Sequence, residues 1–271
     1  MLLSEAIGEF VSDVTKGKTN ETPRTYFTKL CRLVDFFGDI DCCSFTQSSF
    51  TDFSSWFVGR GLSPFTVRSV FMNVRHFLKW LYGRDLVSAS FVDAVPSVKL
   101  PRCLPKAISQ ADFEKMLAVA DCRDKAFLMC LRDTGARVGG LCGARVSDLE
   151  LDNKRLYVLE KGGRGRYVYL SQFTCDCLRD YVISRYPGDA LFGLSRGGAY
   201  SMLRRLAVRC GVKRFNPHSF RHAFARDTIK NGCDLSRLSR LMGHSSVKVT
   251  ADFIQCSRML NYRRRTPFTV P

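Results

Sequence analysis

Three prolines fall within ten residues of this 271-residue chain, with basic residues between them: Pro96, Pro101 and Pro105. Proline fixes the φ angle and has no backbone N–H to donate, so such a run can continue neither a helix nor a central strand. The stretch predicts a stiff, extended linker over residues 96–108. A chain of this length is long enough for two domains, which we place at 1–95 and 109–271.

Helical periodicity dominates the first predicted domain. Apolar residues recur at spacings of three and four in segments near residues 26–37, 50–57 and 67–81, the pattern of helices that bury one face. Ser63 followed by Pro64 is a start signature for the third segment. The sequence predicts about four short helices with an aromatic core.

The second predicted domain begins with helical patterns and then changes to strands. Residues 156–159 and 166–170 are strand-like, and the Gly-rich stretch 160–165 between them predicts a hairpin turn. Helical patterns return from Ser171 onward. The predicted fold class is mainly α with a small β-sheet or hairpin.

Basic residues are distributed unevenly along the chain. Residues 1–100 carry 11 Lys or Arg and 10 Asp or Glu, whereas residues 101–271 carry 31 and 15, so almost all of the net charge of +17 lies in the second part. A strongly basic domain favours a polyanionic partner, above all nucleic acid. The alternative is a solvated basic surface without function.

Twelve cysteines suggest a metal site or disulfides, but their spacing argues against both. No C-x-x-C pair is present, and the nearest pairs, Cys42 with Cys43 and Cys175 with Cys177, have poor chelating geometry. So many thiols favour a reducing compartment. The start of the chain has no signal-peptide pattern and no apolar run reaches 18 residues, so we expect a cytoplasmic protein that contacts no membrane.

Three of the four histidines lie between residues 218 and 244. His218 and Arg221 are three residues apart and share one face of a predicted helix. A guanidinium offers a bidentate fork to a phosphate and an imidazole can transfer a proton, so the pair suits phosphate chemistry. The ordinary alternative is an exposed helix that happens to carry both.

Three further residues complete a candidate set. Arg137 follows a break at Gly135, Lys161 lies on the hairpin turn, and His244 follows a helix end at Gly243. Each has an ordinary alternative, as a surface Arg, a solvated turn Lys and a capping His. Together with the first pair they supply two Arg, two His and one Lys with no acidic group, a set that can stabilise phosphoryl transfer without a metal ion.

These motifs follow one another in a distinctive order. Thr-Gly-x-Arg at 134–137 is followed by Lys161, then by His-x-x-Arg-His at 218–222 and Leu-x-Gly-His-Ser-Ser at 241–246. The order resembles the tyrosine recombinase (phage integrase) superfamily, in the style of its short two-domain, Xer-like members, and covers the whole chain. The resemblance implies a helical core-binding domain, a linker and a mixed α/β catalytic domain that form a C-shaped clamp around duplex DNA.

The resemblance also implies a role for each motif residue. Arg137 and Arg221 would clamp the scissile phosphate, and Lys161 would protonate the leaving 5′ oxygen. His218 would act as general acid or base near the nucleophile, and His244 would hydrogen-bond the phosphate. The family's nucleophile is a tyrosine nine residues after the last histidine, and its attack leaves a 3′-phosphotyrosine and a free 5′-hydroxyl without ATP, metal or another cofactor.

The chain departs from the family pattern at two positions. Phe253 stands nine residues after His244, and phenylalanine has no hydroxyl to form the ester, so the chain is predicted to bind DNA without cutting it. Three explanations are open: an engineered Tyr→Phe change, a natural relative that has lost cleavage, or a nucleophile displaced to Tyr262. Gly140 stands where the family has an acidic residue, three after the first Arg, and the sequence does not show what compensates.

Other DNA contacts are predicted for four basic residues: Arg68, Arg75, Lys79 and Arg164. The first three lie on a helix that resembles the family's major-groove helix, although a solvated helix face explains them equally well, and the fourth lies on the hairpin. The tail from about residue 255 resembles the segment that docks into a neighbouring protomer, although its three arginines at 263–265 could instead contact phosphate. Docking implies a homo-oligomer, a dimer on one recombination site and a tetramer in synapsis.

Two rival functions stay open. A type IB topoisomerase shares the chemistry, but the short helical N-terminal domain and the Leu-Met-Gly-His-Ser-Ser motif disfavour it. A non-catalytic DNA-binding regulator or architectural protein would follow if Phe253 is natural.

Overall fold

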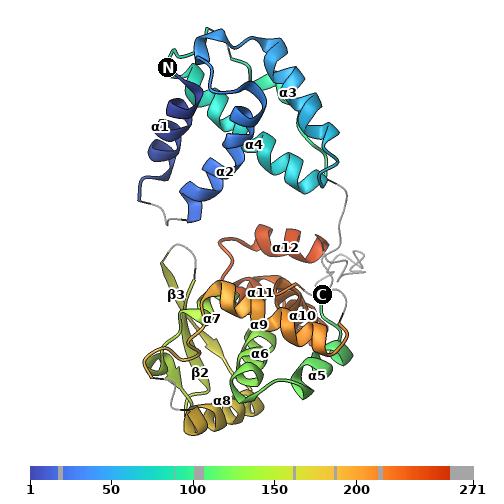
Figure 1. The fold of residues 1–271 in the computed structure, drawn as a ribbon. Coiled ribbons are helices and arrows are strands. Elements are labelled where there is room, and N and C mark those ends of the chain that lie inside the picture. The colour runs from blue at the N-terminus through green and yellow to red at the C-terminus, as the bar shows by residue number, and fades with distance from the viewer. Residues whose placement is uncertain are drawn as a thin grey trace, which may run out of the picture. The chain divides into compact units, whose positions relative to one another are not determined.

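The computed structural model describes residues 1–17, 21–88, 90–100, 107–160, 163–185, 188–212 and 216–256, with only the backbone for residues 21, 22, 185, 255 and 256. Contacts divide the chain into two compact units, 1–103 and 104–271 (Figure 1). The division falls inside the stretch predicted to be a linker, 96–108. Lys161, Tyr262 and the arginines at 263–265 lie outside the described residues.

The described part of the first unit contains four α-helices, as predicted: α1 (Leu3–Thr15), α2 (Glu21–Phe37), α3 (Gln47–Gly59) and α4 (Pro64–Tyr82). Short 3-10 turns lie at Cys42–Ser44 and Val92–Ala94. Six phenylalanines with at most 1% exposure form the centre of its core: Phe10, Phe50, Phe53, Phe57, Phe71 and Phe77. α4 begins at the predicted signature, where the Ser63 hydroxyl accepts a hydrogen bond from the backbone N–H of Thr66 at 3.2 Å.

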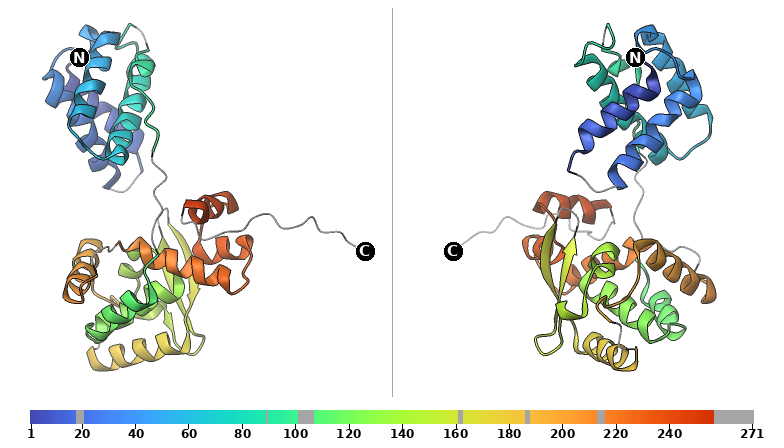
Figure 2. Two further views of the ribbon diagram at one scale, coloured as in Figure 1. Left: turned by 90° about the vertical axis from the view of Figure 1, so that its right-hand side faces the viewer. Right: turned by 60° about the vertical axis from the view of Figure 1, so that its left-hand side comes forward.

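The second unit combines helices with a small sheet (Figure 2). The sheet is antiparallel in the order β1 (Leu149–Glu150), β2 (Arg155–Glu160) and β3 (Arg164–Tyr169). Its described helices are α5 (Gln110–Ala118), α6 (Cys122–Thr134), α7 (Val138–Cys142), α8 (Gln172–Arg185), α9 (Arg196–Arg209), α10 (His218–Lys230), α11 (Leu235–Met242) and α12 (Val247–Cys256). The predicted fold class, mainly α with a small sheet, is confirmed.

The hairpin differs from its prediction in length. We predicted a turn over 160–165, but the ladder pairs Glu160 with Arg164 and Leu159 with Gly165, so the strands extend into that stretch. Alternation along β2 then turns Leu156, Val158 and Glu160 into the unit. An acidic residue therefore occupies the last inward position of the strand.

Two helices of the second unit end in left-handed glycines. α6 ends at Gly135 with φ 60°, and α11 ends at Gly243 with φ 62°. A side chain with a Cβ disfavours this conformation, so glycine is the usual residue at such helix ends. The two ends direct the chain into the segments that carry Arg137 and His244.

Candidate functional site

Arg137 lies directly after the end of α6, in the extended residue that precedes α7. The turn that holds it is fixed locally, because the backbone N–H of Ala136 donates a hydrogen bond to the Thr134 hydroxyl at 3.1 Å. The side chain is 36% exposed, and its guanidinium forms an ion pair with the carboxylate of Glu160. Arg137 is thus held on one side and open to solvent on the other.

Arg221 lies on α10 and its side chain is only 4% exposed. Its guanidinium donates through Nη1 to the carbonyl oxygen of Gly135 and through Nη2 to that of Met242, both at 2.5 Å. These carbonyls lie at the C-terminal ends of α6 and α11, where a positive charge is favoured. Burial and the charge of Arg137 lower the pKa of Arg221 to about 9, so the guanidinium stays protonated at neutral pH.

His218 and His244 lie on either side of this arginine in the sequence. His218 is the first residue of α10 and is only partly covered by the protein, whereas His244 is half-buried after the end of α11, with its Nδ1 2.8 Å from the Thr250 hydroxyl of α12. Burial, followed by the charges of Arg221 and Arg137, lowers the pKa of His218 and lowers that of His244 to about 4. Both imidazoles are therefore neutral at pH 7 and can accept a proton.

Phe253 on α12 packs between two imidazole rings. Its ring stacks on His222, with centroids 4.0 Å apart and planes inclined by 7°, and meets His244 edge to face at 5.5 Å. Position 253 therefore lies against α10 and the His244 turn. We call Arg137, His218, Arg221 and His244 the basic cluster, and Phe253 is its ring neighbour.

The remaining predicted residues have varied surroundings. Arg164 is exposed at the start of β3, and Arg68 and Lys79 are exposed on α4. Arg75 is partly buried and donates from Nη1 to the carbonyl oxygen of Val95 at 2.6 Å, so it has a structural role that the sequence analysis did not include. Contact of these four residues with DNA stays a prediction.

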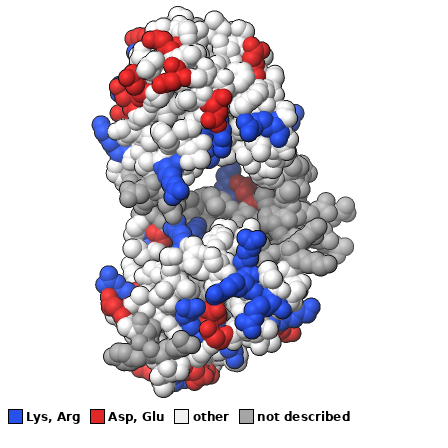
Figure 3. All heavy atoms as spheres, viewed as in Figure 1, with Lys and Arg blue, Asp and Glu red and all other residues white. Residues whose placement is uncertain are grey.

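Charge is segregated on the face of the first unit shown in Figure 3. Acidic side chains gather at the end that carries the N-terminus, and Lys and Arg lie toward the opposite end. The second unit, taken by itself, also carries a group of Lys and Arg side chains with acidic residues beside it in this view. This pattern is suited to a polyanionic partner on limited parts of each unit.

Sequence reasoning missed four residues at the site: Glu160, Arg166, His222 and Thr250. The five predicted residues include no acidic group, but the structure adds one as a neighbour, because Glu160 is buried against the two arginines. Strand alternation with Leu156 and Val158 could have placed Glu160 inward. No local signal indicates the stack of His222 on the ring at 253, because the two residues lie 31 positions apart in the sequence, on different helices.

Acid should destabilise the second unit through its buried histidines. Burial, followed by His218 and Arg221, lowers the pKa of His222 to about 4, against about 6.5 for an unfolded histidine. The unfolded chain then binds more protons between these values, so stability is complete above pH 6.5 and falls as pH drops toward 4. At pH 5 the free energy of unfolding is lower by about 2 kcal/mol because of this histidine alone.

We expect His222→Phe, which keeps a ring for the stack, to reduce the loss of stability between pH 7 and pH 5 by about that amount. Urea unfolding of both proteins at the two pH values measures it. Equal losses in the two proteins would contradict the assignment of the titration to His222.

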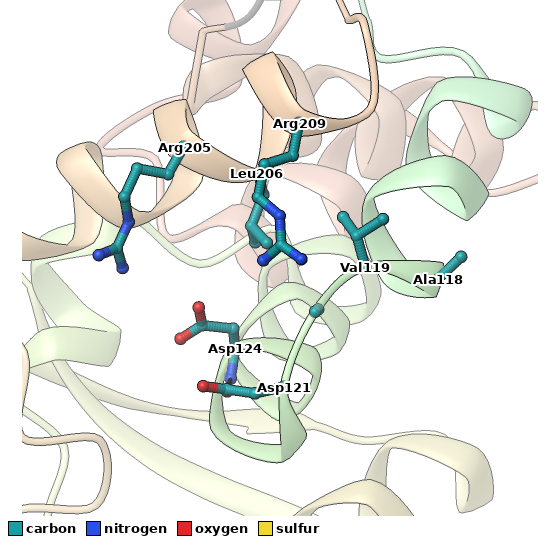
Figure 4. Close-up of a pocket in the computed structure, with 8 residues that line it drawn as sticks. Ala118, Val119, Asp121, Asp124, Arg205, Leu206 and Arg209 are labelled. Atoms are coloured by element: carbon teal, nitrogen blue, oxygen red, sulfur yellow. Dashed lines mark hydrogen bonds between the residues drawn. The ribbon is translucent and has the colours of Figure 1, made fainter.

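The described residues offer no metal centre or membrane span. They contain no group of three or more His, Cys, Asp or Glu that could hold a metal ion, and no helix among them is long and apolar enough to cross a membrane. A pocket of about 620 Å³ opens between α9 and the start of α6, where Arg205 and Arg209 face Asp121 and Asp124 (Figure 4). It shares no lining residue with the basic cluster.

Comparison with known proteins gives a consistent result. The sequence profile of the Phage integrase family matches residues 106–258. The chain is 30% identical to tyrosine recombinase XerC of Corynebacterium glutamicum, over 90% of this chain and 84% of that protein.

Two solved assemblies of lambda integrase share the fold. A dimer bound to a COC′ core site matches with a TM-score of 0.79 and 16% identity, over 100% of this chain and 81% of that one. A tetramer bound to a Holliday junction matches with a TM-score of 0.74 and 16% identity, over 91% and 78%.

Proposed function

The chain belongs to the phage integrase family of tyrosine recombinases, and we propose that it binds a recombination site in double-stranded DNA and holds one phosphodiester against the basic cluster. The observation that carries the proposal is that Arg137 and Arg221 share the carboxylate of Glu160 and act on His244, whose ring meets that of Phe253. The excess of 31 Lys or Arg over 15 Asp or Glu in residues 101–271 supports a nucleic-acid partner.

The proposed reaction needs a tyrosine at position 253. Its hydroxyl oxygen attacks phosphorus, the bond from phosphorus to the 5′ oxygen breaks, and a 3′-phosphotyrosine and a 5′-hydroxyl result. The hydroxyl proton passes to His218, whose lowered pKa leaves the ring neutral at pH 7, and Lys161 protonates the 5′ oxygen. Arg137 and Arg221 stabilise the negative charge that develops on the phosphate oxygens.

In this chain Phe253 offers no hydroxyl, so we infer that the protein binds its site without cutting it. The aromatic packing at position 253 needs only a ring, and phenylalanine supplies it. We propose further DNA contacts for exposed Arg68 and Lys79 in the first unit and for exposed Arg164 in the second unit.

A homo-oligomer fits the same proposal. The lambda integrase matches are a dimer on a core site and a tetramer on a Holliday junction. By analogy we propose two copies of this chain on one recombination site and four in synapsis.

A hydroxyl introduced at position 253 tests the proposal. A random-sequence duplex library is first enriched for DNA bound by the Phe253 protein, and the bound sequences are rebuilt as nicked suicide substrates. We expect Phe253→Tyr to form a covalent protein–DNA adduct on a denaturing gel, and the Phe253 protein to form none. The double variant Phe253→Tyr with Tyr262→Phe should still form the adduct, which excludes a displaced nucleophile.

A second candidate function is a non-catalytic DNA-binding regulator. It is favoured by the packed phenylalanine at the position that would carry the nucleophile. Specific binding without an adduct in either tyrosine-bearing variant would support the regulator, whereas relaxation of supercoiled plasmid without site preference would favour a type IB topoisomerase.

A further inference from the structure

The carboxylate of Glu160 is the one acidic group at the centre of the described site. Its side chain is 4% exposed, and it forms an ion pair with Arg137. Arg166 Nη2 lies 3.2 Å from its Oε1, and Arg221 Nη1 lies 3.9 Å from the same oxygen. Three guanidiniums from three different segments therefore share one buried carboxylate.

This arrangement balances charge that would otherwise be unfavourable. Three cations held this close repel one another, and burial weakens the screening by water that would relieve the repulsion. Burial is the main cause that lowers the pKa of Arg166, and the nearby Arg137 contributes, whereas Glu160 acts in the opposite direction. The carboxylate is thus the group that lets the arginines stay together while they are charged.

Gly140 on α7 faces the same carboxylate. A Cβ added to this glycine would lie 3.6 Å from Glu160 Cγ, 3.6 Å from Val158 Cβ and 3.5 Å from the carbonyl oxygen of Leu159. These are ordinary contact distances, so a longer side chain at 140 would compete with Glu160 for one space. The acidic residue expected at 140 is absent, and a carboxylate reaches the cluster from β2 instead.

Gly243 lies closer still to this group of side chains. A Cβ at Gly243 would lie 2.7 Å from Arg166 Nε and 3.2 Å from Glu160 Oε2. The left-handed glycine that ends α11 therefore also makes room for the Glu160–Arg166 pair. Since Arg166 donates from Nη1 to the carbonyl oxygen of Leu241 at 2.7 Å, the carboxylate is linked to the end of α11 as well.

We propose that Glu160 is a positioning residue, which holds Arg137 and Arg221 side by side toward the phosphate and takes the place of the acidic side chain missing at 140. The proposal rests on the proposed function, because it assigns Glu160 to that same phosphate site. Glu160 itself is buried beneath the arginines and does not contact the DNA.

The first test removes the charge and keeps the shape. In the Phe253→Tyr protein, we expect Glu160→Gln to slow adduct formation roughly a hundredfold, because misplaced catalytic groups lose reactivity steeply. Affinity for the same duplex should stay equal or rise, since a negative charge beneath the phosphate is lost. The matched control is Glu150→Gln, which removes the acid of a pair in the same sheet, 2.7 Å from Arg155 and outside the cluster, and should leave both values unchanged.

The second test moves the carboxylate across the site. Gly140 does not have a left-handed φ, so Gly140→Glu is sterically allowed once Glu160→Gly has cleared the space. We expect Glu160→Gly to slow adduct formation. The Gly140→Glu/Glu160→Gly double variant should form the adduct at least tenfold faster than Glu160→Gly alone. Adduct formation by Glu160→Gln at the parental rate, or loss of both binding and cleavage without recovery in the double variant, would overturn the proposal.

A third measurement does not depend on cleavage. Phenylglyoxal modifies arginine side chains, and mass spectrometry measures the rate at each arginine. In the Phe253 protein without DNA, we expect Glu160→Gln to make the labelling of Arg137 several-fold faster. Exposed Arg68 serves as the internal reference. Unchanged labelling of Arg137 would overturn the role of Glu160. If Phe253→Tyr forms no adduct, the proposed function fails, and this labelling decides the positioning proposal by itself.

Discussion

Arg221→Ala, made together with Phe253→Tyr, is expected to reduce adduct formation by roughly a thousandfold or more while affinity for the duplex falls only a few-fold. The guanidinium is the buried member of the basic cluster, and its loss removes a fixed positive charge where negative charge develops in the reaction. DNA affinity is spread over many basic residues of a chain with 42 Lys and Arg, so one phosphate contact contributes a small part of it.

The variant also removes a structural link, which needs its own control. Arg221 bonds the carbonyl oxygens of Gly135 and Met242, and we expect Arg221→Ala to lower the free energy of unfolding by a few kcal/mol. Arg221→Lys keeps the positive charge but lacks the planar fork, so it should stay folded and still cleave poorly. Arg226→Ala, on the same helix and paired at the surface with Asp227, should cleave normally.

Single-turnover adduct formation and gel-shift titration at one salt concentration measure the two effects. A loss of affinity as large as the loss of cleavage would contradict a catalytic role for Arg221. Normal cleavage by Arg221→Lys would show that any cation at this place is sufficient.

Local patterns were sufficient to predict most helices and the hairpin. The signals at Ser63 and Pro64, and the periodic apolar residues of α4, depend on neighbours within one or two turns. β1 was not predicted because its two residues are too few to show alternation. The length of the hairpin strands was underestimated because glycines at the turn suggest a loop, whereas pairing across the ladder extends it.

The site was predictable only in part, for a physical reason. The order and spacing of the motifs identify Arg137, Arg221 and His244 as candidate site residues. The structure brings these three side chains near one another. The burial of Glu160 depends on guanidiniums from the α6–α7 turn, β3 and α10, and no single window of sequence contains that information. A glutamate followed by Lys-Gly-Gly-Arg has the local character of a solvated turn residue.

Position 253 connects the fold to the proposed chemistry. The stack on His222 and the edge contact with His244 hold an aromatic ring, and neither contact requires a hydroxyl. The packing that would orient a tyrosine is therefore already present around phenylalanine. This is why one substitution, rather than a redesign of α12, is expected to be enough for covalent attachment.

Gly135→Ala should be strongly destabilising, because its backbone and its space both require glycine. Its φ of +60° is left-handed, and an added Cβ would lie 2.4 Å from Phe224 Cδ1 and 2.8 Å from its Cγ. The left-handed backbone should lower the free energy of unfolding by about 1–2 kcal/mol, and the overlap of the new Cβ with Phe224 should lower it by about 1–3 kcal/mol more. Because the carbonyl oxygen of Gly135 accepts from Arg221, a shift of this turn should also slow cleavage in the Phe253→Tyr protein.

Gly193→Ala separates the two causes of this loss. Gly193 has a φ of +59° in the same unit, and a Cβ there would have nothing within 4 Å among the described atoms, so only the backbone cost of about 1–2 kcal/mol should remain. Urea unfolding followed by circular dichroism measures both variants. Both tryptophans, Trp56 and Trp80, lie in the first unit, so the transition seen by their fluorescence should stay in place. Equal losses for Gly135→Ala and Gly193→Ala would mean that Phe224 moves aside at little cost, and that its contact with Gly135 does not require glycine at this position.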